Sequence, residues 1–182
     1  IGERVSAELA ENLGEIVVEV GWTTNRIYIP TETTPSVRLF IPRVDPYSIP
    51  DTDALTDTLV ITSKKETHGI ALTPAGNRLF DSFEQTRDGP LTADPTVVAD
   101  QLATGLTDGL ELAADVETER TTEQIITVRM TQTQFGTADR FDNPATSFFA
   151  VGLATALDTP IEVEYHDTEQ PRTIRANFSW DE

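Results

Sequence analysis

Residues 143–157 read Asn-Pro-Ala-Thr-Ser-Phe-Phe-Ala-Val-Gly-Leu-Ala-Thr-Ala-Leu, and this stretch decides the fold. It has no charged residue, although 24% of the chain is Asp, Glu, Lys or Arg. Asn143 before Pro144 is a typical helix start, with a capping side chain and a first helical residue that needs no free N–H. A helix that is apolar on all sides must be covered on most of them. We predict a central core helix across a sheet; the alternatives are a cavity wall and a dimer seam.

The segments around this helix predict a repeated order of elements. A helix over 95–109 begins with another capping pair, Asp94-Pro95, and strands are predicted on either side of the central helix. In the strand that follows it, apolar residues alternate with Glu162, Glu164 and His166, which would then share the outer face of a sheet. From Pro95 onward the order is helix, strand, strand, helix, strand, strand, with strands at 110–117, 124–131, 161–166 and 173–180.

The first half of the chain predicts further elements of the same domain. A helix over 3–20 has apolar residues at helical spacing and ends at Gly21. A third capping pair, Thr73-Pro74, predicts a helix over 74–86. Prolines break regular pairing between 42 and 57, which makes this surface stretch the best candidate for a mobile element. The remaining strands are expected at 26–29, 37–41, 58–62 and 69–72.

Together these elements predict one compact α+β domain over residues 1–182. Its sheet is mixed or antiparallel and about four helices pack against it. The helix within 1–21 starts without a cap of its own, and the segment 95–180 forms the core of the domain.

The charge of the chain indicates that the protein works in concentrated salt. Thirteen basic residues face 31 acidic ones, which gives a net charge of -18, and only Lys64 and Lys65 are lysines. Carboxylates would repel one another in dilute buffer, but at 1 M salt the screening length falls to roughly 3 Å. We therefore predict a protein of a salt-in halophile. The acids are spread along the chain, which argues against a nucleic-acid mimic or a calcium module, and no basic patch predicts nucleic-acid binding.

No catalytic or metal-binding pattern stands out. The chain has no cysteine, and its two histidines, His68 and His166, lack metal-ligand spacing. Asp139, Arg140 and Asp142 precede the central helix, where a structural cap explains them better than an acid–base pair does. We predict no catalytic residue, no metal and no cofactor, and leave open an enzyme with an unrecognised site.

Three motifs carry a resemblance over the whole length: Leu39-Phe40-Ile41-Pro42, Ala71-Leu72-Thr73-Pro74-Ala75-Gly76, and Asp139–Pro144 followed by Ser147–Ala154. With them the chain resembles an uncharacterised haloarchaeal protein family. That resemblance implies two membrane-spanning helices ahead of the domain, so that Ile1 would lie just past an anchor. The domain would then lie at the cytoplasmic face of the membrane or in the cytoplasm of a halophile. The resemblance carries no site residue and no activity.

A second resemblance covers Pro95–Trp180. The element order, with the Phe/Ala/Gly helix followed by Pro160–Tyr165, is similar to the 4-vinyl-reductase-like ligand-binding domains and the small subunits of the TRAPP complex. Those domains often have cysteines near the last strands, which this chain lacks. The resemblance implies a hydrophobic cavity beside the small-residue helix, lined by Phe135, Phe148, Phe149, Gly152 and Tyr165.

Three functions therefore fit the sequence. The first is a non-enzymatic, membrane-proximal domain that binds a small hydrophobic ligand or a protein partner. The second is an assembly module that forms a homodimer through an apolar surface. The third is an enzyme.

Overall fold

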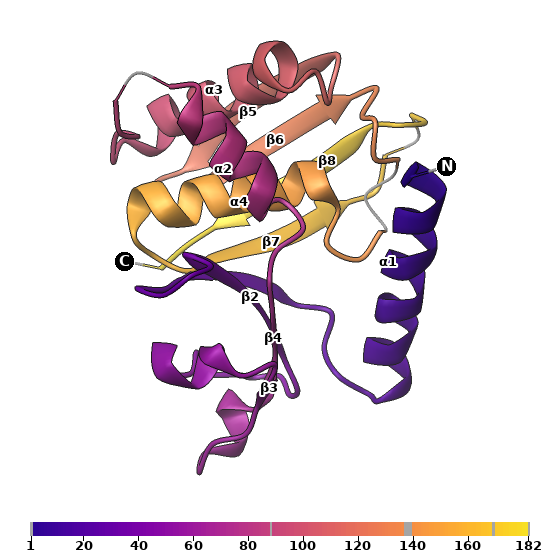
Figure 1. Cartoon of the computed structure of the whole chain (residues 1–182), viewed down its shortest axis with the longest axis vertical. Helices are drawn as coiled ribbons and strands as arrows, with labels where there is room; N and C mark the ends of the chain where they lie inside the picture. The colour runs from indigo at the N-terminus through magenta and orange to yellow at the C-terminus, as the bar shows by residue number, and fades with distance from the viewer. Residues whose placement is uncertain (1, 88, 137–139, 169, 182) are drawn as a thin grey trace.

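The fold is one antiparallel sheet of eight strands with helices packed on one face (Figure 1). A computed structural model describes residues 2–87, 89–136, 140–168 and 170–181, with the side chains from Ala7 onward. Every strand pair in this part of the chain is antiparallel, and the strand order is β3-β4-β2-β1-β7-β8-β6-β5. The predicted α+β class, the compact single domain and the sheet type are confirmed.

The sheet consists of two halves, one from each half of the chain. The N-terminal half contains β1 (Arg26–Pro30), β2 (Val37–Pro42), β3 (Leu59–Val60) and β4 (Gly69–Leu72). The C-terminal half contains β5 (Asp115–Thr122), β6 (Ile125–Thr131), β7 (Ile161–His166) and β8 (Ile174–Ser179). The halves meet where β1 pairs with β7, in the register Arg26↔Val163, Ile27↔Glu162 and Tyr28↔Ile161. Among the residues that the structure describes, these three pairs join the two halves of the sheet.

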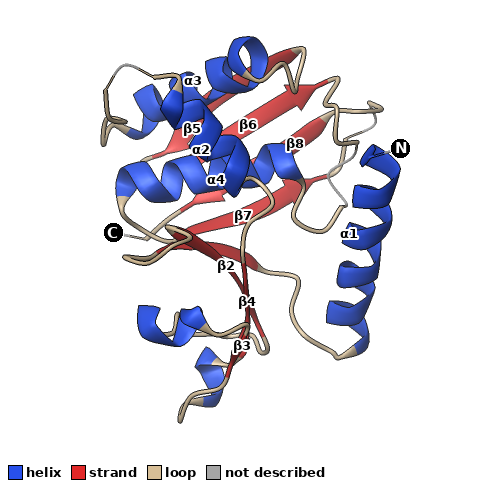
Figure 2. Cartoon of the chain, viewed as in Figure 1, coloured by secondary structure: helices blue, strands red, loops and turns tan. Residues whose placement is uncertain are grey.

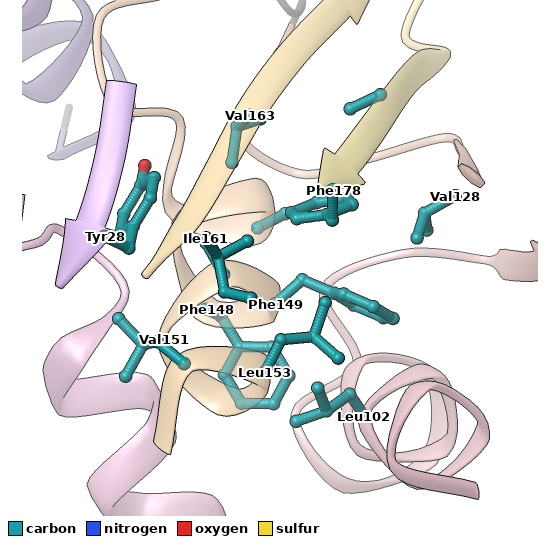
Figure 3. Close-up of a cluster of buried hydrophobic side chains, with 14 of the residues drawn as sticks. Tyr28, Leu102, Val128, Phe148, Phe149, Val151, Leu153, Ile161, Val163 and Phe178 are labelled. Carbon is teal, nitrogen blue, oxygen red and sulfur yellow. The ribbon is translucent and has the colours of Figure 1, made fainter. Parts of the chain in front are cut away.

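The helix predicted at the centre of the core is there. It is α4 (Pro144–Leu157), and every residue from Ala145 to Ala154 is buried. Asn143 caps its start by accepting a hydrogen bond from the Ala145 N–H, as the sequence predicts. Apolar side chains from β1, β6, β7 and β8 meet α4 in one cluster, in which the rings of Phe149 and Phe178 lie 5.1 Å apart (Figure 3).

Two further helices cover α4. These are α3 (Pro95–Thr104), which continues into a π-helical turn at Gly105–Gly109, and α2 (Asn77–Gln85) (Figure 2). Asp94 caps α3, as predicted, through hydrogen bonds from two backbone N–H groups. Gly152 lets α4 approach α3 closely, because a Cβ at this position would lie 2.4 Å from the Leu102 Cδ2.

The opposite face of the sheet is covered in part by the proline-rich segment that follows β2. This segment contains a short 3-10 helix, Thr52–Thr56, whose Leu55 is fully buried in a second apolar cluster with Ile27, Ile29 and Phe40. The Tyr47 hydroxyl also donates to Glu162 on β7 (3.1 Å). The predicted surface stretch is therefore anchored to the sheet at two points.

Three predicted boundaries are wrong for local reasons. The helix predicted from Pro74 begins at Asn77, because the N–H groups of Ala75 and Gly76 donate to side chains beside α4 instead of entering a helix. Strand β3 has two residues rather than five. Strand β5 begins at Asp115 rather than Leu110, because the chain after α3 stays helical through Gly109.

The N-terminal helix stands at one side of the molecule, away from α2, α3 and α4 (Figure 1). It is α1 (Gly2–Glu19), and Gly21 follows it with a φ of 70°, as its predicted role at the helix end requires. Its apolar stripe is largely exposed, which distinguishes α1 from the other helices. No helix among the described residues has the length and the apolar character needed to cross a membrane.

Candidate functional site

The aromatic residues predicted to bind a ligand are mostly core residues. Phe148 and Phe149 are fully buried, and Leu102 fills the space next to Gly152. None of the four cavities lined by described residues includes Phe135, Phe148, Phe149 or Gly152. Tyr165 does line a cavity, where the start of β1 meets β7 near the middle of the sheet. A ligand site beside the middle of α4 therefore stays a prediction without support from these cavities.

The largest of these cavities is a groove of about 710 Å³ between α1 and the sheet. Its floor includes Arg26 at the start of β1, Ile41 on β2 and Phe141 before α4, and Arg140 also lines it. The wall formed by α1 is mostly small or apolar near the floor and carries three exposed glutamates. A volume of this size is typical of sites for small molecules. We call this cavity the α1 groove; the residues of α1 that line it are Ala7, Ala10, Glu11, Gly14, Glu15, Val17, Val18 and Glu19.

Arg26 is the charged group at the floor of the α1 groove. Its guanidinium carbon lies 5.8 Å from the Phe141 ring centre and 5.2 Å from the Tyr165 ring centre, so the cation contacts two aromatic rings. One terminal N–H donates over a long 3.4 Å to the Thr24 carbonyl oxygen. The buried Nε–H finds no acceptor among the described residues, and no described carboxylate forms an ion pair with Arg26.

That isolation is unusual in a protein with 31 acidic residues. A half-buried guanidinium normally finds a carboxylate or a set of carbonyl oxygens, because its burial otherwise costs solvation energy. Arg26 instead keeps a charge beside an apolar hollow of molecular size. The groove therefore combines apolar side chains with the guanidinium groups of Arg26 and Arg140, and three glutamates lie on its α1 wall.

A buried polar cluster lies next to the groove, at the start of α4. Asp142 accepts hydrogen bonds from the Tyr28 hydroxyl (2.7 Å) and from the Ala75 N–H (2.6 Å). Burial raises the pKa of the Asp142 carboxyl, while these hydrogen bonds, a further one from Ser147 and the charge of Arg26 act in the opposite direction. Burial, followed by the charge of Asp142, raises the pKa of Tyr28 well above its ordinary value.

Neighbouring bonds complete this cluster. The Ser147 hydroxyl accepts from the Gly76 N–H (2.9 Å), and the hydroxyls of Thr146 and Tyr165 lie 2.6 Å apart. Burial also raises the pKa of Tyr165, which the charge of Arg26 opposes. Each carboxyl oxygen of Asp142 thus has a protein donor, and the cluster ties β1, the turn before α2 and the start of α4 together. This arrangement suits a structural junction better than a general acid or base.

The residues proposed for an enzyme site do not meet in one cleft. Arg140 and Asp142 line a small cavity of about 200 Å³, with Leu9, Leu13 and Leu72. His166 lies on β7, in register with Arg175, and does not line that cavity. Asp139 falls outside the described residues. Asn143, rather than Asp142, caps α4.

A second groove of about 590 Å³ lies between α2 and α3. Its one basic residue, Arg87, lies over the Phe83 ring at 5.2 Å, and its guanidinium donates to the Pro90 carbonyl oxygen (3.3 Å) and to Gln101 (3.5 Å). Arg87 thus has two hydrogen-bond acceptors, whereas Arg26 has one long hydrogen bond and a buried Nε–H without an acceptor among the described residues.

Sequence reasoning missed Arg26 and Phe141. Arg26 begins the short strand Arg-Ile-Tyr-Ile-Pro, where it is the only charged residue. A charged residue at the start of a strand is common and does not by itself indicate a binding site. Its importance comes from segments far away in the chain, because Phe141 and Tyr165 reach its side chain only in the folded protein.

Comparison with known proteins gives one match. A family model described as a domain of unknown function (DUF7982) matches residues 1–180. No curated protein and no solved structure matches the chain.

Proposed function

The chain belongs to the DUF7982 family, and we propose that its domain is a non-enzymatic binding module for a small amphiphilic carboxylate. The apolar part of the ligand lies in the α1 groove against Val17, Ile41 and Phe141, and the carboxylate faces Arg26. A compound with only apolar surface would leave the buried Nε–H of Arg26 without an acceptor, so the anionic end contributes to specificity.

One observation carries this proposal. Arg26 is a half-buried cation with an unpaired Nε–H, in contact with two aromatic rings and at the floor of a groove of about 710 Å³. The hydrophobic ligand predicted from the sequence is retained in this proposal, but its site moves from α4 to the groove under α1. The membrane-proximal position, the haloarchaeal source and the resemblance to 4-vinyl-reductase-like domains stay predictions.

Octanoate is a suitable probe, tested by thermal shift and isothermal titration calorimetry in molar KCl. We expect octanoate to raise the melting temperature more than octanol does, and octylamine to have the smallest effect. Replacing Arg26→Met keeps an unbranched side chain and removes the charge. This variant should bind octanoate about tenfold more weakly or worse, since a charge-assisted hydrogen bond contributes about 1.5–3 kcal/mol.

Two further variants make the result interpretable. Arg78→Met removes an exposed arginine of α2 that lines none of the four cavities, and it should bind octanoate like the parent chain. Thr24→Trp retains Arg26 and places a large side chain at an exposed position of the groove wall, so it should also weaken binding. Equal shifts by octanoate and octylamine, or unchanged octanoate binding by the Arg26→Met variant, would refute the proposal.

A further inference from the structure

Helix α1 carries an apolar stripe that the domain itself does not cover. Leu9, Leu13, Ile16 and Val20, which directly follows α1 and whose N–H still donates to the Ile16 carbonyl oxygen, have exposed fractions of 60%, 42%, 56% and 55%. They follow one another at intervals of four, three and four residues. This is the spacing of the seam in a coiled coil, with Leu9 and Ile16 at one core position of the heptad and Leu13 and Val20 at the other.

A different line of the helix contacts the domain. Val17 is buried, and a Cβ added to Gly14 would lie 3.7 Å from the Phe141 Cβ. The backbone after the helix folds back, with the Trp22 N–H donating to the Val17 carbonyl oxygen (3.1 Å). The contact with the domain therefore leaves much of the stripe exposed. Two faces of α1 are apolar, and only one of them has a partner among the described residues.

The surface beside the stripe continues its apolar character. Leu9 and Leu13 also line the cavity of about 200 Å³, together with Leu72, Phe141 and Pro144. A helix laid along the stripe would contact both the stripe and this hollow. Because packed helices need side chains that fit between those of the partner, a hollow beside a row of Leu and Ile side chains suits a second helix.

The charges around the stripe indicate which partner fits. The positions next to the seam hold Ala10, Val17, Asn12 and Glu19, so only one of the four is charged. Along the stripe itself, between Glu8 and Val20, the other glutamates lie at outer positions of the heptad; they are Glu8, Glu11 and Glu15. A basic partner helix would be matched by acidic residues at the flanking positions. A second copy of this chain needs flanks without like charges, and the flanks meet that need.

From these features we infer that α1 pairs with α1 of a second copy of the chain, through Leu9, Leu13, Ile16 and Val20. Each copy has a net charge of -18, so the pair is repelled in dilute buffer, and association should increase with salt. The pairing does not depend on the proposed ligand. The stripe lies on a face of α1 that does not line the α1 groove.

Sedimentation velocity or light scattering in molar KCl, over a range of protein concentrations, tests this inference. The parent chain should show a concentration-dependent shift from one to two copies, and the Leu13→Glu/Ile16→Glu variant should stay monomeric at the same melting temperature. A matched control, Glu8→Gln/Glu15→Gln, changes two outer positions and should dimerise like the parent chain. If the parent chain is strictly monomeric up to its solubility limit, the inference is wrong.

Because the chain has no cysteine, single cysteines can locate the interface directly. Leu13→Cys and Ile16→Cys, at the centre of the stripe, should form intermolecular disulfides under mild oxidation, because these bonds need Cα atoms about 4.4–6.8 Å apart. Glu11→Cys and Glu15→Cys, at outer positions, should not do so. A monomer that binds lipid vesicles through Leu13 and Ile16 would assign the stripe to a membrane surface and would also overturn the inference.

The two proposals can fail separately. The Arg26→Met variant should still dimerise, and the Leu13→Glu/Ile16→Glu variant should still bind octanoate. Loss of both properties in either variant would point to a displaced α1 rather than to a specific site, and circular dichroism on each variant would reveal that change.

Discussion

Tyr28 brings a hydroxyl group into the buried polar cluster at the start of α4, where it donates to the carboxylate of Asp142. We expect Tyr28→Phe to lower the free energy of unfolding by about 1.5–3 kcal/mol near neutral pH, which is typical of a lost hydrogen bond to a charged group. The cost should fall toward about 1 kcal/mol once Asp142 is protonated, because the lost bond is then between neutral groups.

The direction of this pH dependence follows from the pKa of Asp142. Burial raises that pKa above its value in the unfolded chain, so the group favours the folded state at low pH and loses this contribution as the pH rises through the folded pKa. Without the Tyr28 hydroxyl the pKa of Asp142 in the folded protein rises further. The difference in the free energy of unfolding between the parent chain and the variant therefore widens with increasing pH. Denaturant unfolding in molar KCl at several pH values measures it. Tyr47→Phe, which removes a half-buried hydrogen bond to Glu162, is the control and should cost less. If the Tyr28→Phe variant and the parent chain differ by the same free energy of unfolding at every pH, the hydrogen bond from Tyr28 to an ionised Asp142 is contradicted.

Individual residues were predictable where the signal is local. Asn143 and Asp94 cap their helices as expected, because a capping side chain acts within three residues of itself. Thr73 looks equally good in sequence but caps nothing, since the amides after it bond to Asp142 and Ser147 from a distant segment. Arg26 shows the same limit, because the two rings around it come from the other half of the chain.

At the scale of elements, the contact between α3 and α4 rests on the absence of a side chain at Gly152. Gly152→Ala should destabilise the protein by about 1–2 kcal/mol, because the new methyl group meets the fully buried Leu102 and this cost exceeds the gain in helix propensity. Leu102→Ala alone should cost about 2–5 kcal/mol through the cavity it leaves. The double variant should cost less than the sum of the two, since the methyl group then occupies part of that cavity. Strictly additive values in a denaturant double-mutant cycle would show that the helices do not meet here.

The central helix was predicted well because a helix without a charged residue must be buried in a protein so rich in acidic residues. Helix α1 was predicted equally well as a helix, yet its apolar stripe is exposed rather than packed on the sheet. Periodicity predicts that a helix has an apolar face, but it cannot say which surface will cover that face. The ligand cavity expected beside α4 is filled at Gly152 for a related reason, because small residues allow close helix packing as readily as they leave space.

At the scale of the whole molecule, stability should depend on dissolved salt. The net charge of -18 already counts every basic residue, so 18 acidic groups remain in excess however the charges pair, and the described side chains form one ion pair, between Arg129 and Glu117 (3.1 Å, both exposed). We expect the melting temperature to rise from dilute buffer to molar KCl, as the screening length falls from about 10 Å at 0.1 M to about 3 Å at 1 M. NaCl and KCl should act alike at equal concentration, because screening depends on ionic strength. Thermal unfolding followed by circular dichroism checks this, and equal stability in dilute buffer would contradict it.

The narrow join between β1 and β7 bears on how the chain matures during translation. Strands β1 to β4 can pair with one another as soon as they emerge from the ribosome, but the other edge of β1 has no neighbour at that stage. Tyr28 pairs with Leu39 on β2 at this stage, and it gains its second cross-strand partner only when Ile161 has been synthesised. Until then the nascent chain presents an open strand edge with an apolar face. A nascent chain is therefore most exposed to wrong pairing with its neighbours on the same polysome in the interval before β7 emerges.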